Sequence, residues 1–387
     1  GEEHPHTLTI MSTLAETLRL QGDYEGARKL NEQVLGMRRI VLGNDHPGTL
    51  TTMGNLAGIL DDQGDYEGAR KLQVQVLEAR RKLLGDDHPD TLTIMNNLAE
   101  TLRLQGDYEG ARKLNEQVLE IMRNVFGEEN PHTLASMNNL ASTLGDQGDY
   151  EGARKLQVQV LEVQRKLLGA EHPQTLGTIN NLANTLSLLG DYKGARKFNE
   201  QILEIQRKLL GDEHPYTLTS MNNLASTLGD QGDYEGARKL QVQVLKILPK
   251  VLGAEHPYTL SSMNNLASTL GNQGDYEGAR KLKMQVLDIR RKVLGAEHPD
   301  TLSSMNNLAI TLGEQGDYEG ARELQEKVLE MRRKLLGAEH YDTLISMNNL
   351  ANTLGLLGDY EGARKLNKKV LDIRRKVLGA EHPDTLS

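Results

Sequence analysis

The 387-residue chain has no cysteine, no tryptophan and only two phenylalanines. The lack of cysteine excludes disulfide bonds and thiolate metal sites. No apolar run approaches the roughly 18 residues that a membrane-spanning helix needs. No signal peptide opens the sequence, so an intracellular, cytoplasmic location is expected. With aromatic residues at 4%, any core must consist of Leu, Val, Ile, Met, Ala and Tyr.

A concentration of positive charge is also missing. The net charge is −9 and the isoelectric point is near 5.7. A nucleic-acid scaffold would show a basic stripe, and a protein held at a membrane surface would show a polybasic segment. We therefore expect neither a nucleic-acid partner nor a membrane partner.

What the sequence does contain is one phrase repeated at a fixed interval. The twenty residues 137–156 recur unchanged at 221–240, and recur at 263–282 with the single change Asn272. Ten leucines mark a period of 42 with no insertion or deletion: Leu8, Leu50, Leu92, Leu134, Leu176, Leu218, Leu260, Leu302, Leu344 and Leu386. A strict period overrides the two or three domains that length alone suggests. We expect one repeat domain over residues 1–387, cut from a longer protein because both ends fall at the same phase.

Each repeat is predicted to be a pair of helices. In the repeat that begins at Pro89, apolar residues follow helical spacing in 89–105 and again in 108–126. The first predicted apolar face comprises Leu92, Met95, Leu98, Ala99 and Leu102. The second comprises Tyr108, Ala111, Leu114, Val118, Ile121, Met122 and Val125. One such pair cannot bury both faces, but stacking identical pairs can.

Turn residues separate the predicted helices. Pro89 suits the first helical turn, where its missing N–H is no loss. Gly106 can adopt the left-handed conformation that ends the first helix. Asp107 can then cap the second helix by accepting from the backbone N–H two or three residues on, and Gly127 ends that helix.

These residues resemble a known family. Met95, Leu98, Ala99, Leu102, Gly106, Tyr108 and Ala111 take most of the places that define the tetratricopeptide repeat, although Val118 replaces its last small residue. The phrases NNLA and LGxEHPxTL are typical of the 42-residue form found in kinesin light chains and nephrocystin-like proteins. The resemblance covers the whole chain. It implies an all-α solenoid of nine helix-turn-helix repeats, wound as a right-handed superhelix with the first helices inside.

The resemblance also implies a function, namely binding of a protein or extended peptide in the concave groove, without catalysis or cofactor. The predicted groove-facing arc of a first helix holds Thr93, Asn96, Asn97, Glu100 and Leu104. Amides repeated along such an arc offer donors and acceptors to a peptide backbone. The candidate peptide-binding residues are Asn96, Asn97, Asn138, Asn139, Asn180, Asn181, Asn222, Asn223, Asn264, Asn265, Asn306, Asn307, Asn348 and Asn349.

An alternative interpretation of these amides is structural. One Asn per repeat could tie neighbouring helices together through backbone hydrogen bonds, and the series of Asn97 is the better candidate for that role. The positions of Glu100 and Leu104 vary among repeats whose other residues are nearly fixed. They are the expected determinants of ligand sequence, or a surface that drifts without constraint.

Two other functions remain open. The array could be the sensor region of a larger signalling NTPase, although no G-x-x-x-x-G-K-[ST] motif occurs in this chain. It could also be a spacer or a self-assembling rod without a specific ligand. Neither end shows a polar capping helix, so end-to-end association is expected.

Nine of the eleven histidines lie in the turn between repeats, one in most copies: His4, His46, His88, His172, His214, His256, His298, His340 and His382. Stacked repeats place equivalent side chains about 10 Å apart, too far to share one zinc ion. Asn130 replaces histidine in one copy, which indicates a hydrogen-bonding turn residue. We expect no metal and no catalytic site, because a catalytic site is a singular constellation.

Two further residues carry structural predictions. Pro249 stands where the other copies have Arg, so we expect a kink or an early helix end near Leu248. Arg112 has an equivalent Arg in all nine repeats, which suggests a recurrent ion pair between repeats.

Overall fold

The computed structural model describes residues 5–377, which form eighteen α-helices and no strand. The first helices of the repeats are α1 (Pro5–Leu20), α3 (Pro47–Asp62), α5 (Pro89–Leu104), α7 (Pro131–Asp146), α9 (Pro173–Leu188), α11 (Pro215–Asp230), α13 (Pro257–Asn272), α15 (Pro299–Glu314) and α17 (Tyr341–Leu356). The second helices are α2 (Tyr24–Leu42), α4 (Tyr66–Leu84), α6 (Tyr108–Phe126), α8 (Tyr150–Leu167), α10 (Tyr192–Leu210), α12 (Tyr234–Val251), α14 (Tyr276–Leu294), α16 (Tyr318–Leu336) and α18 (Tyr360–Val377). The prediction of an all-α repeat fold is confirmed.

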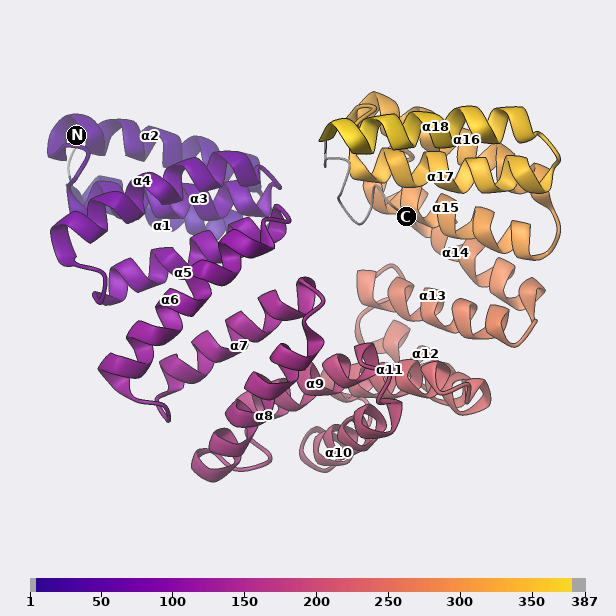
Figure 1. Cartoon of the computed structure of the whole chain (residues 1–387), viewed down its shortest axis with the longest axis horizontal. Helices are drawn as coiled ribbons and strands as arrows, with labels where there is room; N and C mark the ends of the chain where they lie inside the picture. The colour runs from indigo at the N-terminus through magenta and orange to yellow at the C-terminus, as the bar shows by residue number, and fades with distance from the viewer. Residues whose placement is uncertain (1–4, 378–387) are drawn as a thin grey trace. The chain divides into compact units, whose positions relative to one another are not determined.

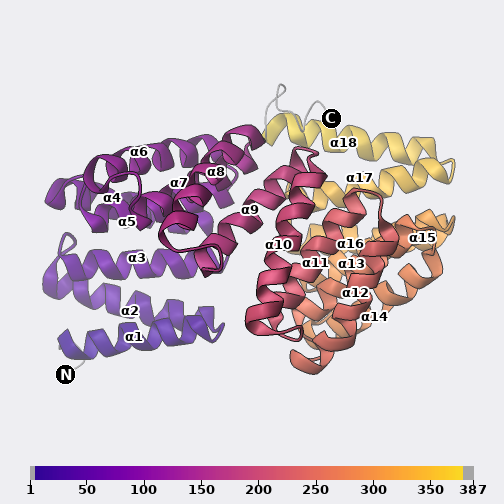
Figure 2. The same cartoon turned by 90° about the horizontal axis from the view of Figure 1, so that it is seen from below.

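The chain divides into two compact halves after Ala195, within α10. In the first half each helix packs on the next from α1 to α9, and in the second half the same holds from α11 to α18 (Figures 1 and 2). First helices of neighbouring repeats also touch, as α1 does with α3 and α3 with α5. This succession of stacked pairs is an α-solenoid. The expectation of a single repeat domain over residues 1–387 stays a prediction.

The core lies between repeats as well as within them. One cluster joins Leu119 of α6 to Met137 and Leu140 of α7 and to Ala153 and Val160 of α8. An equivalent cluster joins Leu287 of α14 to α15 and α16. Each second helix therefore buries apolar side chains against the following pair, which is why the pairs stack in sequence.

The predicted turn chemistry is confirmed. Gly106 has φ of 83°, and the Asp107 carboxylate accepts from the backbone N–H of Gly110 at 3.0 Å. Gly127, with φ of 84°, ends α6. A Cβ on Gly110 would lie 2.6 Å from Oδ2 of Asp107, so a larger residue would displace the cap. The recurrent Y-E-G-A-R phrase is thus explained by the cap.

The turn histidines cap the first helices. The Nδ1 atom of His88 accepts from the backbone N–H of Asp90 at 3.1 Å, and Pro89 follows at the first helical position. The Oδ1 atom of Asn130 accepts the equivalent hydrogen bond from the backbone N–H of His132 at 2.9 Å. The prediction of a hydrogen-bonding turn residue is confirmed for His46, His88, His172, His214, His256, His298 and His340. His4 and His382 lie outside the described residues.

The predicted core needs one correction. Leu92, Met95, Leu98, Ala99 and Leu102 are all buried, but Val125 of α6 is 50% exposed. The second helix has 19 residues and the first has 16, so the last turn of α6 extends past its neighbour by about 4.5 Å. The adjacent Phe126 is exposed for the same reason.

The prediction that the helix ends early near Leu248 is wrong. Helix α12 continues through Pro249 to Val251, and the N–H of Leu252 still donates to the carbonyl of Leu248 at 2.9 Å. Helix α8 is equally short although it carries Arg165 at the equivalent position. The proline lies close enough to the helix end that few hydrogen bonds depend on it.

The ion pair predicted for Arg112 is also wrong, because the partner is not in another repeat. Arg112 pairs with Glu116, four residues further along the same helix, at 2.8 Å. Ion pairs between repeats come from other positions, such as Lys166 with Glu129 at 2.8 Å. One turn of helix brings Glu116 closer than any carboxylate of the neighbouring repeat.

Candidate functional site

The first half contains a hollow of about 820 Å³ lined chiefly by three consecutive first helices, α5, α7 and α9. The second helices contribute Asn115, Tyr150 and Gln157. Its walls are mostly uncharged polar side chains, so it presents hydrogen-bonding groups more than apolar surface. The residues that vary among repeats enter it as Glu100, Asp146 and Leu188.

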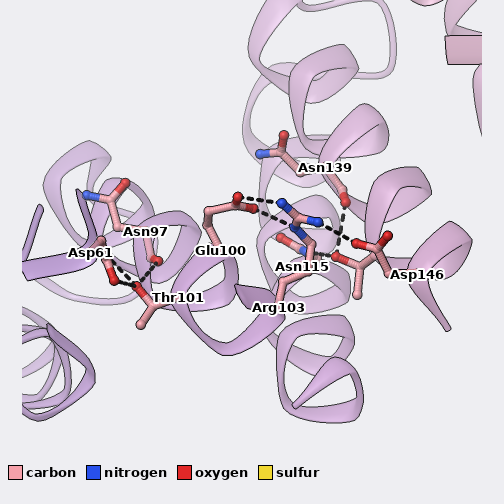
Figure 3. A network of polar contacts seen from close by, with 9 residues as sticks. Asp61, Asn97, Glu100, Thr101, Arg103, Asn115, Asn139 and Asp146 are labelled. Atoms are coloured by element: carbon pink, nitrogen blue, oxygen red, sulfur yellow. Dashed lines mark hydrogen bonds and ion pairs between the residues drawn. The ribbon is translucent and has the colours of Figure 1, made fainter. Parts of the chain in front are cut away.

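One predicted amide series faces this hollow. Asn97, Asn139 and Asn181 line it from successive first helices, and all three are exposed. Their side-chain amides make no hydrogen bond with the residues that the structure describes; Figure 3 shows Asn97 and Asn139 pointing away from the dashed contacts. Three unpartnered amides, one per repeat, thus stand at the edge of one hollow. Their role in binding stays a prediction.

In the other amide series, Asn138 and Asn222 tie repeats together, whereas Asn96 also lines the hollow and its Oδ1 has no hydrogen-bond partner. The Asn222 amide, which is buried, donates to Oγ of Ser262 at 2.8 Å and to the Tyr258 hydroxyl at 2.9 Å. Asn138 donates to Thr178 at 3.5 Å in the same way. The structural interpretation of the amides is therefore supported for Asn138 and Asn222, which belong to the series of Asn96 and not to that of Asn97, and the ties run through side chains instead of backbone.

The remaining candidates are placed less uniformly. Asn265 is exposed, whereas Asn223 and Asn307 are half-buried. Asn349 donates to Oδ1 of Asn306 at 2.9 Å and so joins the two series across one repeat boundary. In the series of Asn96, the half-buried members are Asn96, Asn138, Asn180, Asn264, Asn306 and Asn348.

A charged network that sequence reasoning missed crosses the hollow. Arg103 donates two hydrogen bonds to Glu100, at 2.8 and 2.7 Å, and a third to Asp146 of the next repeat (Figure 3). The hydrogen bond from Arg103 lowers the pKa of Glu100. Arg19 and Asp62 form the same bridge at 2.6 Å. The signal in the sequence is an Arg followed 43 residues later by an Asp, found at both places.

A second missed feature is a row of buried threonines. Asn115 of α6 donates to Oγ1 of Thr143 in the following repeat at 2.9 Å (Figure 3). One repeat earlier, the Asp61 carboxylate accepts from Thr101 at 2.8 Å and from Gln73 at 3.1 Å. Burial is the main reason that the pKa of Asp61 is raised to about 6. These contacts form a polar layer beneath the row of exposed amides, Asn97, Asn139 and Asn181.

No other kind of site is evident in the described part of the chain. Between residues 5 and 377 no group of three or more His, Cys, Asp or Glu side chains could hold a metal ion. Over the same range no helix is both long and apolar enough to cross a bilayer.

Comparison with known proteins agrees with the repeat architecture. The sequence profile described as tetratricopeptide repeat matches nine overlapping segments, residues 6–82, 57–124, 90–166, 132–208, 175–250, 222–291, 258–334, 311–376 and 342–387. No protein with a curated description matched significantly.

Solved structures with similar folds include repeat proteins related to kinesin light chains. A putative kinesin light chain from Podosopora anserina with nearly identical TPR-like repeats is 35% identical over 54% of this chain and 99% of that one, with a TM-score of 0.48. BtubC (BKLC) from P. vanneervenii is 21% identical over 60% and 94% of the two chains, with a TM-score of 0.51. The apo quorum sensor NprR from B. thuringiensis is 15% identical over 95% and 99%, with a TM-score of 0.56.

The period of 42, the paired helices, the stacked core and the profile matches across residues 6–387 lead to one assignment. The chain belongs to the tetratricopeptide repeat family.

Proposed function

We propose that this array is a non-enzymatic interaction scaffold of the cytoplasm that binds an extended peptide segment along its first helices. The observation that carries the proposal is the exposed amide row of Asn97, Asn139 and Asn181 at the edge of the 820 Å³ hollow. An extended backbone presents alternating carbonyl and N–H groups, and an amide can pair with both.

The charge of the hollow supports a neutral or weakly basic segment. Arg103 offsets only one of the two carboxylates that it touches, Glu100 and Asp146, so the network keeps one net negative charge. A strongly acidic segment would meet repulsion here.

The test is a peptide-display selection on the full chain, followed by affinity measurement of the selected peptides. The variant carries Asn97→Ala, Asn139→Ala and Asn181→Ala. Each lost hydrogen bond is worth about 0.5–1.5 kcal/mol net. We therefore expect the triple variant to bind at least about tenfold more weakly.

The matched control replaces three exposed amides at equivalent places on second helices, Gln75, Gln117 and Gln159, which do not line the hollow. The control should bind like the wild type. Equal binding by both variants would refute the amide row. Failure of the selection to yield any ligand would favour the rod without a specific ligand.

A further inference from the structure

Three equivalent positions meet at each repeat boundary: one near the end of a first helix, one twelve residues on in the second helix, and one on the following first helix. At the first described boundary with all three polar, they are Asp61, Gln73 and Thr101. The Asp61 carboxylate fills the space between the other two, accepting from Gln73 Nε2 at 3.1 Å and from Thr101 Oγ1 at 2.8 Å.

In other repeats the second-helix residue bonds the threonine directly, and no carboxylate lies between them. At three boundaries the second-helix residue is Asn or Lys and donates directly to the threonine. The pairs are Asn115 with Thr143 at 2.9 Å, Asn199 with Thr227 at 2.9 Å and Lys283 with Thr311 at 2.6 Å. In these repeats nothing is left for a ligand to satisfy.

At three boundaries the first position is a glycine and this space is open: Gly145, Gly229 and Gly313, which are followed by the buried Gln157, Gln241 and Gln325. The boundary at Gly145 is the one of these three that opens into the 820 Å³ hollow. Gly145, Gln157 and Thr185 hold the three positions, and all three line the hollow. A Cβ built on Gly145 would meet no atom within 4 Å. Gln157 is 4% exposed; its Oε1 atom is buried without a hydrogen-bond partner, and its Nε2 donates to no described residue. In Gln73 the equivalent Oε1 is likewise unpartnered while Nε2 donates to Asp61, so Nε2 is the atom that a group over Gly145 would meet.

We propose that the space over Gly145 is a subsite for a primary carboxamide, the side chain of an Asn or Gln in the bound peptide. Its oxygen takes the place of the Asp61 carboxylate and accepts from Nε2 of Gln157. Its NH₂ donates to Oγ1 of Thr185, as the Asn115 amide does to Thr143. The inference rests on the proposed function, since the carboxamide arrives on a peptide held by the amide row.

The surroundings favour a carboxamide over a carboxylate. Burial raises the pKa of Asp61 to about 6, so a negative charge is disfavoured at this position. Near Gly145 the charged groups in the hollow are Asp146 and Glu100, both bonded to Arg103. The Thr185 hydroxyl already donates to the Asn181 carbonyl at 3.0 Å, which leaves its oxygen free to accept from an NH₂ group.

The experiment uses the full chain labelled with ¹⁵N-glutamine and titrated at pH 7.5 with acetamide, acetate or N,N-dimethylacetamide. We expect acetamide to shift the Gln157 side-chain signals saturably, and to do so at lower concentration than acetate. Dimethylacetamide lacks the N–H donor and should bind more weakly than acetamide. Stronger binding of acetate would overturn the carboxamide assignment, as would Gln157 signals that acetamide does not move.

The matched control is a variant in which a side chain of the protein itself fills the space over Gly145. Gly145→Asp recreates the arrangement of Asp61, so it should abolish the acetamide shift, whereas Gly177→Asp, on the exposed part of α9, should not. If Gly145→Asp does not fold by circular dichroism, Thr185→Val tests the same contact and should weaken acetamide binding. An unchanged shift in the folded variant refutes the subsite.

Peptides from the display selection separate the two proposals. Loss of affinity in the triple Asn→Ala variant with no effect of Gly145→Asp would leave the groove function standing and would remove the subsite. Loss in both variants supports both.

Discussion

At the scale of single residues, one methylene group decides whether a repeat completes its own hydrogen bonds. The shorter side chain of Asn115 donates a hydrogen bond to Thr143 at 2.9 Å. The longer side chain of Gln73 donates instead to the Asp61 carboxylate at 3.1 Å. Gln157 has the same length but faces Gly145 in place of an aspartate. Near-identical repeats therefore differ in whether they are closed or open to a ligand.

Asp61 gives a prediction of pH dependence. Its pKa of about 6 in the folded chain lies above the ordinary value of 3.8, so the folded state binds the proton more tightly than the unfolded state. The free energy of unfolding should therefore rise as pH falls from above 6 toward 4. We expect a gain of about 1–2 kcal/mol, allowing for the partial exposure of the site. Chemical denaturation at a series of pH values measures it.

The control for this prediction is Asp61→Asn, which keeps an acceptor oxygen but cannot titrate. The difference in unfolding free energy between wild type and Asp61→Asn should narrow as pH falls through 6. A difference that is constant between pH 7.5 and 4.5 would contradict the assignment.

At the scale of helices, local signals set each boundary. An Asp cap with a glycine three residues on begins each described second helix, and His or Asn followed by Pro begins most first helices. Each cap stabilises its helix by about 1 kcal/mol. Because the signals recur every 42 residues, so do the helix ends.

Pro249 stands inside α12 where the other repeats have Arg, and it gives a prediction. Pro249→Arg supplies an N–H for the carbonyl of Leu245 and removes the clash of the ring with the preceding turn. The local stability of α12 should rise by up to about 3 kcal/mol, the upper value for a proline inside a helix. Hydrogen exchange is the suitable measurement, because repeat arrays need not unfold as one cooperative unit.

The reverse change provides the comparison. Helix α8 has the same length as α12 and carries Arg165 at the equivalent position. Arg165→Pro should speed exchange in α8. If neither substitution alters exchange in its helix, the proline is without energetic effect at this place.

At the scale of the whole molecule, stability comes from each repeat covering the next. In α5 the side chains of Ile94 and Leu98 are 2% and 5% exposed, because the preceding repeat covers them. The equivalent Ile10 and Leu14 of α1 are 56% and 50% exposed. This face is thus an uncovered copy of an interface that is buried elsewhere.

We expect this face to promote end-to-end association at high concentration. Leu14→Glu places a charge on it and should lower the mass observed by sedimentation at high protein concentration. Leu20→Glu, at another exposed leucine of the same helix, is the control and should not. A wild-type chain that stays monomeric at millimolar concentration would contradict the expectation.

Sequence reasoning worked where a residue's role depends on its immediate neighbours along the chain. The replacement of histidine by Asn130 indicated a hydrogen-bonding turn, and the cap bonds of His88 and Asn130 confirm it. It did less well where the partner lies in another repeat. The tie made by Asn222 and the bridge between Arg103 and Asp146 both join residues about 40 positions apart.

The sequence by itself determined the period, the helix boundaries and the family, because capping and apolar spacing act over a few residues and recur in every copy. Only the tertiary structure decided which of two adjacent amides faces the hollow and which ties the repeats. Asn138 and Asn139 differ by about 100° around the helix, and the direction of the neighbouring helix selects between them. The same holds for Gly145, where a small residue became an opening only once Gln157 and Thr185 were brought beside it.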